Sequence, residues 1–338
     1  MMKAVGYQQS LPSSDKEALQ DITLPIPQVS GRDLLVEVQA VSVNPVDTKV
    51  RQRASLDAGQ WKVLGWDAVG IVKAVGPEAG LFKVGDRVWY AGDISRSGSN
   101  AQYQLVDERI VGTAPKTIGC AEAAALPLTA ITAWEMLFDR LQVAVGKGAN
   151  NKSLLIIGAA GGVGSIMVQL ARRLTNLTVI GTASRPETKS WLEELGSHHV
   201  INHRQSLSEQ LSREGIDGVD YVVSLTNTED HLAEIIKSIR PQGKFGLIDD
   251  PASLNVIALK QKSVSLHWEF MFTRALFTTE DMVAQHVLLN ELAELIDQGL
   301  IKTTMGQNFG KINANNLLKA HQLIESQAAK GKIVLEGF

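Results

Sequence analysis

A cluster of glycines between two apolar segments is the part of this sequence whose residue types best suit a chemical role. Glycine adopts positive φ and has no Cβ, so backbone N–H groups can approach an anion closely. An apolar segment at residues 154–157 precedes the cluster, and an amphipathic segment follows it from residue 163. Strand, glycine turn and helix in this order are typical of a site for a dinucleotide diphosphate. The backbone candidates for that site are Gly158, Ala160, Gly161, Gly162, Val163 and Gly164.

The spacing of the glycines fits the dinucleotide motif only in part, because Met167 follows where a third small residue would allow closer helix–strand packing. A tight strand-to-helix connection without a ligand is the alternative interpretation. Since a second apolar segment at residues 179–183 completes the strand–helix–strand unit, we favour the dinucleotide site.

Residues after the second strand indicate which dinucleotide is bound. An NAD site usually has Asp or Glu at this place, to bind the ribose hydroxyls. Here the chain has Ser184 and Arg185, with Lys189 shortly after and Glu187 close by. A guanidinium offers a planar fork of donors to a phosphate, so we predict NADP(H) as the cofactor. A solvated helix start is the alternative role for these cations.

Composition limits the classes of protein to consider. The 338 residues are enough for about two domains, and 44% hydrophobic and 20% charged residues are typical of a globular protein. A net charge of −3 gives no electrostatic reason to expect nucleic acid or an anionic membrane as partner. Apolar runs stay short of the ~20 residues of a membrane span, and the polar start does not resemble a signal peptide. We therefore expect a cytoplasmic protein.

Metal-ligating residues are scarce in the first half of the chain. Cys120 is the single cysteine, which excludes a disulfide or a cysteine-rich zinc site, and we expect it to be a small buried residue. None of the seven histidines precedes His198. A catalytic zinc site in the N-terminal part would have to be built from carboxylates and one cysteine, so we predict no metal.

Short strands separated by turn residues are predicted over the first ~127 residues, as in a compact barrel-like domain. These strands are expected at residues 3–7, 34–43, 68–75, 87–90 and 102–106. Further strands at 219–223 and 244–248 are predicted to alternate with helices at 206–213 and 228–240. A capping-box-like pattern at 278–281 predicts the start of a helix that ends at Gly299.

Five segments together resemble the medium-chain dehydrogenase/reductase superfamily, and best its zinc-free, quinone oxidoreductase-like branch, whose members are often labelled zinc-type alcohol dehydrogenase-like. They are SVNPVDT at residues 42–48, GWDAVGIV at 65–72, VGDRV at 84–88, AAGGVG at 159–164 and GKIVL at 331–335. Zinc-dependent members have a His-Glu pair where this chain has Trp66 and Asp67. They also have a ligand cysteine ahead of the segment at 44–47, and this chain has none there.

The resemblance implies an α/β fold of two domains. A GroES-like β-barrel catalytic domain would cover residues 1–127, and a Rossmann domain with a doubly wound parallel sheet would bind NADP(H) at residues 128–270. Residues 271–338 would return to the catalytic domain.

The resemblance also implies roles for four residues of the catalytic domain. Asn44 would lie beside the nicotinamide, where its amide can donate to an oxygen that gains charge; an Asn-Pro corner is the alternative. Thr129 would lie near the nicotinamide or cap the N-terminus of a helix, or both. Lys49 replaces a tyrosine common in quinone oxidoreductases, and would polarise a carbonyl or stay on the surface. Trp66 would form a flat wall for an aromatic substrate, or belong to the core.

Three further residues are candidates for binding the cofactor. His203 aligns with an aromatic position that borders the adenosine phosphate in the family, and an exposed loop residue is the alternative. Asn227 follows a predicted strand, at the carboxyl edge of the sheet where ligands bind. Lys332 would reach the cofactor from the returning C-terminal segment.

Our hypothesis is a zinc-independent, NADPH-dependent oxidoreductase that transfers hydride to a quinone or an α,β-unsaturated carbonyl. The alternatives are a zinc-dependent alcohol dehydrogenase and an NADPH-binding sensor with little or no catalysis. The partner is a small-molecule substrate, and the loops around 51–61 and 266–280 would set its identity. The apolar run at 264–272 would pair edge to edge in a homodimer, or form a buried strand and turn.

Overall fold

The computed structural model describes residues 1–53, 56–57, 59–148 and 151–338. The chain forms two compact units, one of residues 1–131 with 272–338 and the other of residues 132–271. We call them the N/C unit and the middle unit. The loop at 51–61, expected to influence the choice of acceptor, lies partly outside the described residues.

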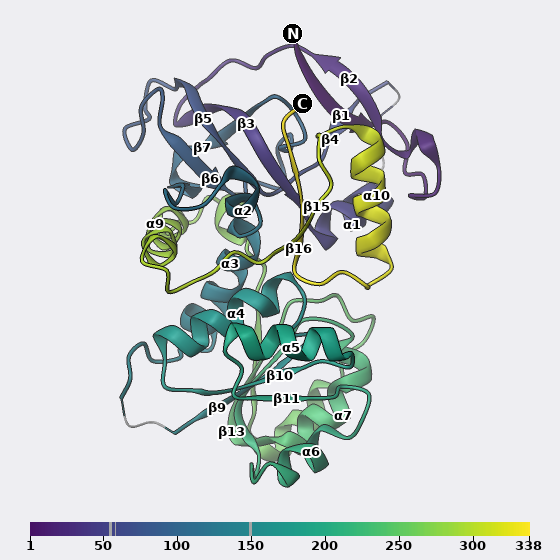
Figure 1. Cartoon of the computed structure of the whole chain (residues 1–338), viewed down its shortest axis with the longest axis vertical. Helices are drawn as coiled ribbons and strands as arrows, with labels where there is room; N and C mark the ends of the chain where they lie inside the picture. Colours follow the sequence, from purple (N-terminus) through teal and green to yellow (C-terminus); the bar gives the residue numbers. More distant parts are fainter. Residues whose placement is uncertain (54–55, 58, 149–150) are drawn as a thin grey trace. The chain divides into compact units, whose positions relative to one another are not determined.

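The middle unit is built on a doubly wound parallel sheet (Figure 1). Its strand order is β11-β10-β9-β12-β13-β14, and each neighbouring pair is parallel. The order reverses between β9 and β12, and ligands of such sheets bind at this point, outside the carboxyl ends of the strands. The strands are β9 (Ser153–Ile157), β10 (Thr178–Thr182), β11 (His199–Ile201), β12 (Val219–Ser224), β13 (Ile239–Leu247) and β14 (Ser265–Trp268).

Helices cover both faces of this sheet, with α4 and α5 on one face and α6 and α7 on the other (Figure 1). Every residue of β9 is buried, which explains its uninterrupted apolar sequence. In the amphipathic segment predicted from residue 163, which forms α4, Met167, Leu170 and Ala171 are buried, while Val163 and Leu174 at its two ends are half-buried. The bounds are α4 (Gly162–Leu174), α5 (Pro186–Leu195), α6 (Leu207–Arg213) and α7 (Thr228–Ser238), with the π-helix η3 (Glu135–Arg140) and the 3₁₀-helix η4 (Val256–Lys262).

The N/C unit contains a large sheet of order β15-β16-β3-β5-β6-β8, with β7 paired to β3, and a smaller sheet of order β2-β1-β4. Strand β16 near the C-terminus pairs with β3, so the last strand returns to the unit that contains the first. The strands are β1 (Met2–Tyr7), β2 (Gln20–Leu24), β3 (Asp33–Val43), β4 (Lys62–Val63), β5 (Ala68–Val75), β6 (Arg87–Tyr90), β7 (Tyr103–Asp107), β8 (Val111–Thr113), β15 (Met305–Asn308) and β16 (Lys332–Glu336).

Helices of 3 to 14 residues connect the strands of the N/C unit, and α3 continues past residue 131 into the middle unit. They are α1 (Pro45–Arg53), α2 (Cys120–Ala124), α3 (Pro127–Trp134), α8 (Thr273–Leu276), α9 (Ala284–Asp297), α10 (Ala314–Glu325), and the 3₁₀-helices η1 (Lys16–Ala18) and η2 (Glu108–Ile110). In the part of the chain that the structure describes, none of the helices is long and apolar enough to cross a membrane.

The helix predicted to start at 278–281 begins later, at Ala284. Asp281, which the pattern suggested as a capping residue, instead accepts hydrogen bonds from the Arg274 guanidinium and the Thr279 hydroxyl. The end was predicted correctly, because Gly299 follows α9 with φ of 72°. The helix predicted at 228–240 ends at Ser238, where β13 begins directly.

Two glycines of the turn after β9 are required by the backbone. Gly158 has φ of 78°, in the left-handed region that favours glycine. At Gly164, a Cβ would lie 2.4 Å from the Cα of Ala159, so helix and strand approach too closely there for a side chain. The dinucleotide motif has a third small residue where this chain has Met167. Here the close approach of α4 to the end of β9 occurs at Gly164 instead.

We predict that Gly164→Ala lowers the free energy of unfolding by about 1–3 kcal/mol or more, because the added Cβ must displace the backbone of residue 159. Thermal or urea unfolding measures the change. Gly80→Ala is the matched control, since no atom lies within 4 Å of its added Cβ. Equal stability of the two variants would contradict the prediction.

Candidate functional site

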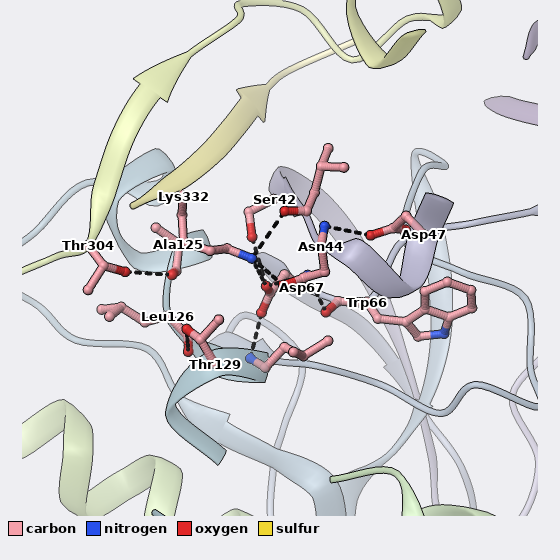
Figure 2. A network of polar contacts seen from close by, with 12 residues as sticks. Ser42, Asn44, Asp47, Trp66, Asp67, Ala125, Leu126, Thr129, Thr304 and Lys332 are labelled. Atoms are coloured by element: carbon pink, nitrogen blue, oxygen red, sulfur yellow. Dashed lines mark hydrogen bonds and ion pairs between the residues drawn. The ribbon is translucent and has the colours of Figure 1, made fainter. Parts of the chain in front are cut away.

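A buried carboxylate lies at the centre of a polar network in the N/C unit (Figure 2). Asp67 immediately precedes β5 and is fully buried. Its Oδ2 accepts hydrogen bonds from Ser42 Oγ at 2.7 Å, Asn44 Nδ2 at 2.8 Å and Lys332 Nζ at 2.9 Å. Its Oδ1 accepts from the backbone N–H of Leu128 at 2.7 Å. The carboxylate thus joins β3, β5, α3 and β16.

Strand register brings these residues together although they are far apart in the sequence. Strand β3 pairs with β5 on one side and with β16 on the other. Val43 lies opposite Ile333, and Val41 lies opposite Ala68. Residues at one end of three adjacent strands therefore meet, and Lys332 is placed beside the corner at Asn44.

Every polar group of the Asn44 side chain already has a partner. Its Nδ2 donates to Asp67 Oδ2 at 2.8 Å and to the Trp66 carbonyl at 3.3 Å, and its Oδ1 accepts from Lys332 Nζ. A hydrogen bond from Asn44 to a substrate oxygen would therefore replace one of these contacts. The bond to Trp66 is the longer one, and so the weaker of the two.

The other three candidates lie in different surroundings. Thr129 is inside α3, where its hydroxyl donates to the Leu126 carbonyl at 3.1 Å; the helix begins at Pro127, so the capping role for Thr129 is wrong. Trp66 is fully buried and donates from Nε1 to the Asp93 carbonyl, with Phe272 packed edge to face at 6.1 Å. These are the surroundings of a core tryptophan. Lys49 is a half-buried residue of α1.

The glycine turn presents backbone at the carboxyl end of β9. Gly161 is the N-cap of α4 and has no side chain to bond the first N–H groups of the helix. Such groups, together with the helix dipole, favour an anion. Ala160, Gly161, Gly162 and Val163 are partly exposed, while Gly164 is buried against the strand. The turn therefore fits the diphosphate of a dinucleotide.

Charged residues gather after β10, at the same edge of the sheet. Arg185 is the N-cap residue of α5, and its Nε lies 3.2 Å from a carboxylate oxygen of Glu187. Lys189 lies 3.9 Å from Glu193 on the exposed side of that helix. Ser184 is half-buried beside Arg185. Glu187, the nearby acid that could otherwise turn toward a ribose, is thus paired with the Arg185 guanidinium.

His203 and Asn227 follow β11 and β12 at this edge. His203 packs edge to face against His231, with ring centroids 6.1 Å apart, and its buried Nδ1 has no hydrogen-bond partner within the described ranges. Burial, followed by the charge of His231, lowers the pKa of His203. Asn227 is exposed in the left-handed conformation, with φ of 50°. Lys332 lies in the network of the N/C unit instead.

Two family models match the chain over much of its length. The model described as an alcohol dehydrogenase GroES-like domain matches residues 30–133, and the model described as a zinc-binding dehydrogenase matches residues 195–335. A zinc-type alcohol dehydrogenase-like protein of Staphylococcus aureus (strain MSSA476) is 42% identical over 338 residues, which cover 99% of each chain. The chain belongs to the medium-chain dehydrogenase/reductase superfamily, in its quinone oxidoreductase-like branch.

Two other members support this assignment. A mouse quinone oxidoreductase is 28% identical over 323 residues, covering 93% of this chain and 92% of the relative. A crystal structure from Rhizobium etli CFN 42, named for the zinc-dependent alcohol dehydrogenases, is 54% identical. It superposes with a TM-score of 0.96 over 100% of this chain and 98% of its own. Membership of this superfamily identifies the chain as an oxidoreductase with an α/β fold.

The oxygen atoms around Lys332 do not fit the zinc of the superfamily's metal-dependent members. Zinc prefers three or four Cys, His or carboxylate ligands. Within the ranges that the structure describes, no three His, Cys, Asp or Glu side chains are grouped so that they could hold a metal ion. The cation bound to Asp67 and Asn44 is instead the Lys332 ammonium. The described residues of this network therefore do not fit a catalytic zinc.

Sequence reasoning missed Asp67, the central residue of the network, and noted it only as the replacement of a zinc-ligand position. Its position directly after Trp66 in a turn gave no indication of four donors. The expectation for Cys120 was also wrong. This residue is half-buried, with Sγ 3.1 Å from Gln39 Oε1, at a cavity of about 520 Å³ away from the network.

Asp47 is a second buried carboxyl group near the network. Its Oδ2 accepts from the Asn44 backbone N–H at 2.7 Å, while its Oδ1 has no hydrogen-bond partner in the described parts of the chain. Burial raises the pKa of Asp47 to about 7, although the Asn44 N–H and the charge of Lys332 lower it. The folded protein thus binds this proton more tightly than the unfolded chain does.

The free energy of unfolding should therefore decrease as the pH rises from about 4, where an unfolded aspartate ionises, to about 7. We predict that Asp47→Asn removes this decrease and stabilises the protein above pH 7 by up to a few kcal/mol. Urea unfolding at pH 4.5 and 8 measures it, with the exposed Asp217→Asn as control. Parallel pH profiles for wild type and Asp47→Asn would contradict the prediction.

Proposed function

We propose that this chain is a zinc-independent, NADPH-dependent oxidoreductase that transfers hydride to a quinone or an α,β-unsaturated carbonyl. The observation that carries the proposal is the Lys332 ammonium bound to Asp67 and Asn44. The ammonium supplies a positive charge beside Asp67, and Trp66 and Asp67 stand where zinc-dependent members have their His-Glu pair. Reduction of a polarised double bond by hydride needs hydrogen-bond donors for the acceptor oxygen and does not need a metal.

In this proposal the middle unit binds NADPH. The glycine turn from Gly158 to Gly164 holds the diphosphate, and Ser184, Arg185 and Lys189 bind the 2′-phosphate. His203 and Asn227 border the adenosine. Bound NADPH supplies the hydride. Arg185 supports this choice of cofactor because a guanidinium binds a phosphate with two parallel hydrogen bonds.

The N/C unit binds the acceptor in this proposal. Asn44 donates to the acceptor oxygen as it gains charge, exchanging its long bond to the Trp66 carbonyl for the new one. Thr129 and Lys49 are the other polar groups assigned to the acceptor. Trp66, buried against Phe272, keeps the adjacent backbone in place.

We also propose that the protein forms a homodimer through β14. This strand lies at the end of the parallel sheet, and an edge strand offers unpaired backbone groups to a second copy. Trp268, the last residue of β14, and Phe270 just after it are 52% and 48% exposed. Exposed apolar rings beside an edge strand support a contact with a second copy.

NADPH oxidation by the purified protein with a panel of quinones and enones tests the function. We expect turnover that persists after chelation, with zinc well below one equivalent by elemental analysis. Turnover that requires near-stoichiometric zinc would favour the alternative of a zinc-dependent alcohol dehydrogenase, as the names of several relatives suggest. Tight NADPH binding without turnover of any acceptor would favour a sensor.

The proposed cofactor preference gives a separate prediction. Arg185→Ala should weaken NADPH by about tenfold or more, because hydrogen bonds between charged groups contribute roughly 1.5–3 kcal/mol. NADH affinity should change little, since it lacks the 2′-phosphate. Dissociation constants from fluorescence titration measure both. Arg173→Ala, exposed in the last turn of α4, is the control, and an equal loss for the two cofactors would contradict the assignment.

A further inference from the structure

Lys332 is a lysine with almost no contact with water. It is 3% exposed, and its ammonium donates to the Val43 carbonyl at 3.3 Å, to Asn44 Oδ1 and to Asp67 Oδ2 at 2.9 Å. An ammonium has three hydrogens, so each of them has a protein acceptor. Lys332 therefore has no donor left for a cofactor phosphate. Its effect on the reaction must pass through the groups that it contacts.

The ammonium and the Asp67 carboxylate together determine which way the Asn44 amide points (Figure 2). An amide has an acceptor end and a donor end. Lysine can only donate, so it requires the Asn44 oxygen on its side. An ionised aspartate can only accept, so it requires the Asn44 NH₂ on its side. A flipped amide would place two donors together and two acceptors together, and both contacts would be repulsive.

The contact with the Lys332 ammonium also strengthens Asn44 as a donor. An ammonium that donates to the amide oxygen draws electron density away from the amide nitrogen, which makes its N–H groups better donors. Linked hydrogen bonds polarise one another in this way in a buried environment. Asn44 is 1% exposed and Asp67 is fully buried, so little water screens the charge. The weaker Nδ2 bond, to the Trp66 carbonyl, is the one that can be exchanged.

We propose that Lys332 is a positioning residue for the reaction: its ammonium, paired with Asp67, fixes and polarises the Asn44 amide so that Nδ2 is the group offered to the acceptor oxygen. This inference rests on the proposed function. It replaces the role of a cofactor ligand that the sequence suggested for Lys332. Catalysis would then depend on an ion pair whose members contact neither NADPH nor the acceptor.

The test uses two variants of the full chain, because one of them alone is ambiguous. Lys332→Met leaves the Asp67 charge buried and unpaired, which strongly destabilises a protein. The double variant Asp67→Asn/Lys332→Met removes both charges. The new amide at 67 can still accept from the Leu128 N–H, but it presents NH₂ to Asn44 and so favours the flipped orientation. Lys319→Met, at an exposed position of α10, is the control.

We expect the double variant to recover most of the thermal stability that Lys332→Met loses, and to bind NADPH within about twofold of wild type. Its kcat should nevertheless fall about tenfold or more, because a misplaced donor no longer stabilises the acceptor oxygen. If kcat recovers together with stability, Lys332 is only structural and the proposal is wrong. It is also wrong if NADPH affinity falls in parallel with kcat, since Lys332 would then serve the cofactor.

A spectroscopic measurement separates this proposal from the proposed function. The side-chain NH₂ signals of Asn44, identified by their loss in Asn44→Asp, should move in the double variant and stay in place in Lys319→Met. Unchanged signals in the double variant overturn the positioning role. If the wild type reduces no acceptor, the proposed function fails, while these signals still show whether Lys332 orients Asn44.

Discussion

The N/C unit depends on a buried ion pair between Asp67 and Lys332. Removing two charges from water is costly, and the attraction between them compensates only when the remaining lone pairs and hydrogens are satisfied. Here they are, because Asp67 accepts four hydrogen bonds and Lys332 donates three. The satisfied pair specifies one arrangement of β16, β3 and β5. The position of the Asn44 side chain, at the end of β3, depends on that arrangement.

The two units offer different kinds of polar groups. At the glycine turn of the middle unit they are backbone groups, because Gly158 and Gly164 permit a conformation and an approach that other residues do not. In the N/C unit the polar groups are side chains held by one another. A backbone site tolerates changes in side chains, whereas the network around Asp67 tolerates few.

The glycine turn and the alternation of strands and helices were predictable from the sequence, because residues close in the sequence determine them. β9 and the stripe of α4 are examples. The network was not predictable, because it depends on register between distant strands. Asn44 and Lys332 were each selected as candidates, but their contact spans 288 positions. Short strands such as β2 and β15 also escaped prediction, since pairing partners, and not an apolar pattern, determine them. Thr129 and the start of α9 were misjudged because other local hydrogen bonds formed: Thr129 donates to the Leu126 carbonyl, and Asp281 accepts from Arg274 and Thr279.

The interrupted course of the N/C unit has a consequence for biosynthesis. The middle unit is continuous from residue 132 to 271, so it can complete its sheet while later residues are still being translated. The N/C unit must wait for β16, which follows residue 331 and brings the only ammonium that the Asp67 carboxylate contacts among the described residues. Until the ribosome releases β16, the Asp67 carboxylate of the nascent chain lacks its ion-pair partner, and β3 lacks one of its neighbouring strands. Binding by chaperones during this interval would therefore matter more for the first 131 residues than for the 140 residues that follow them.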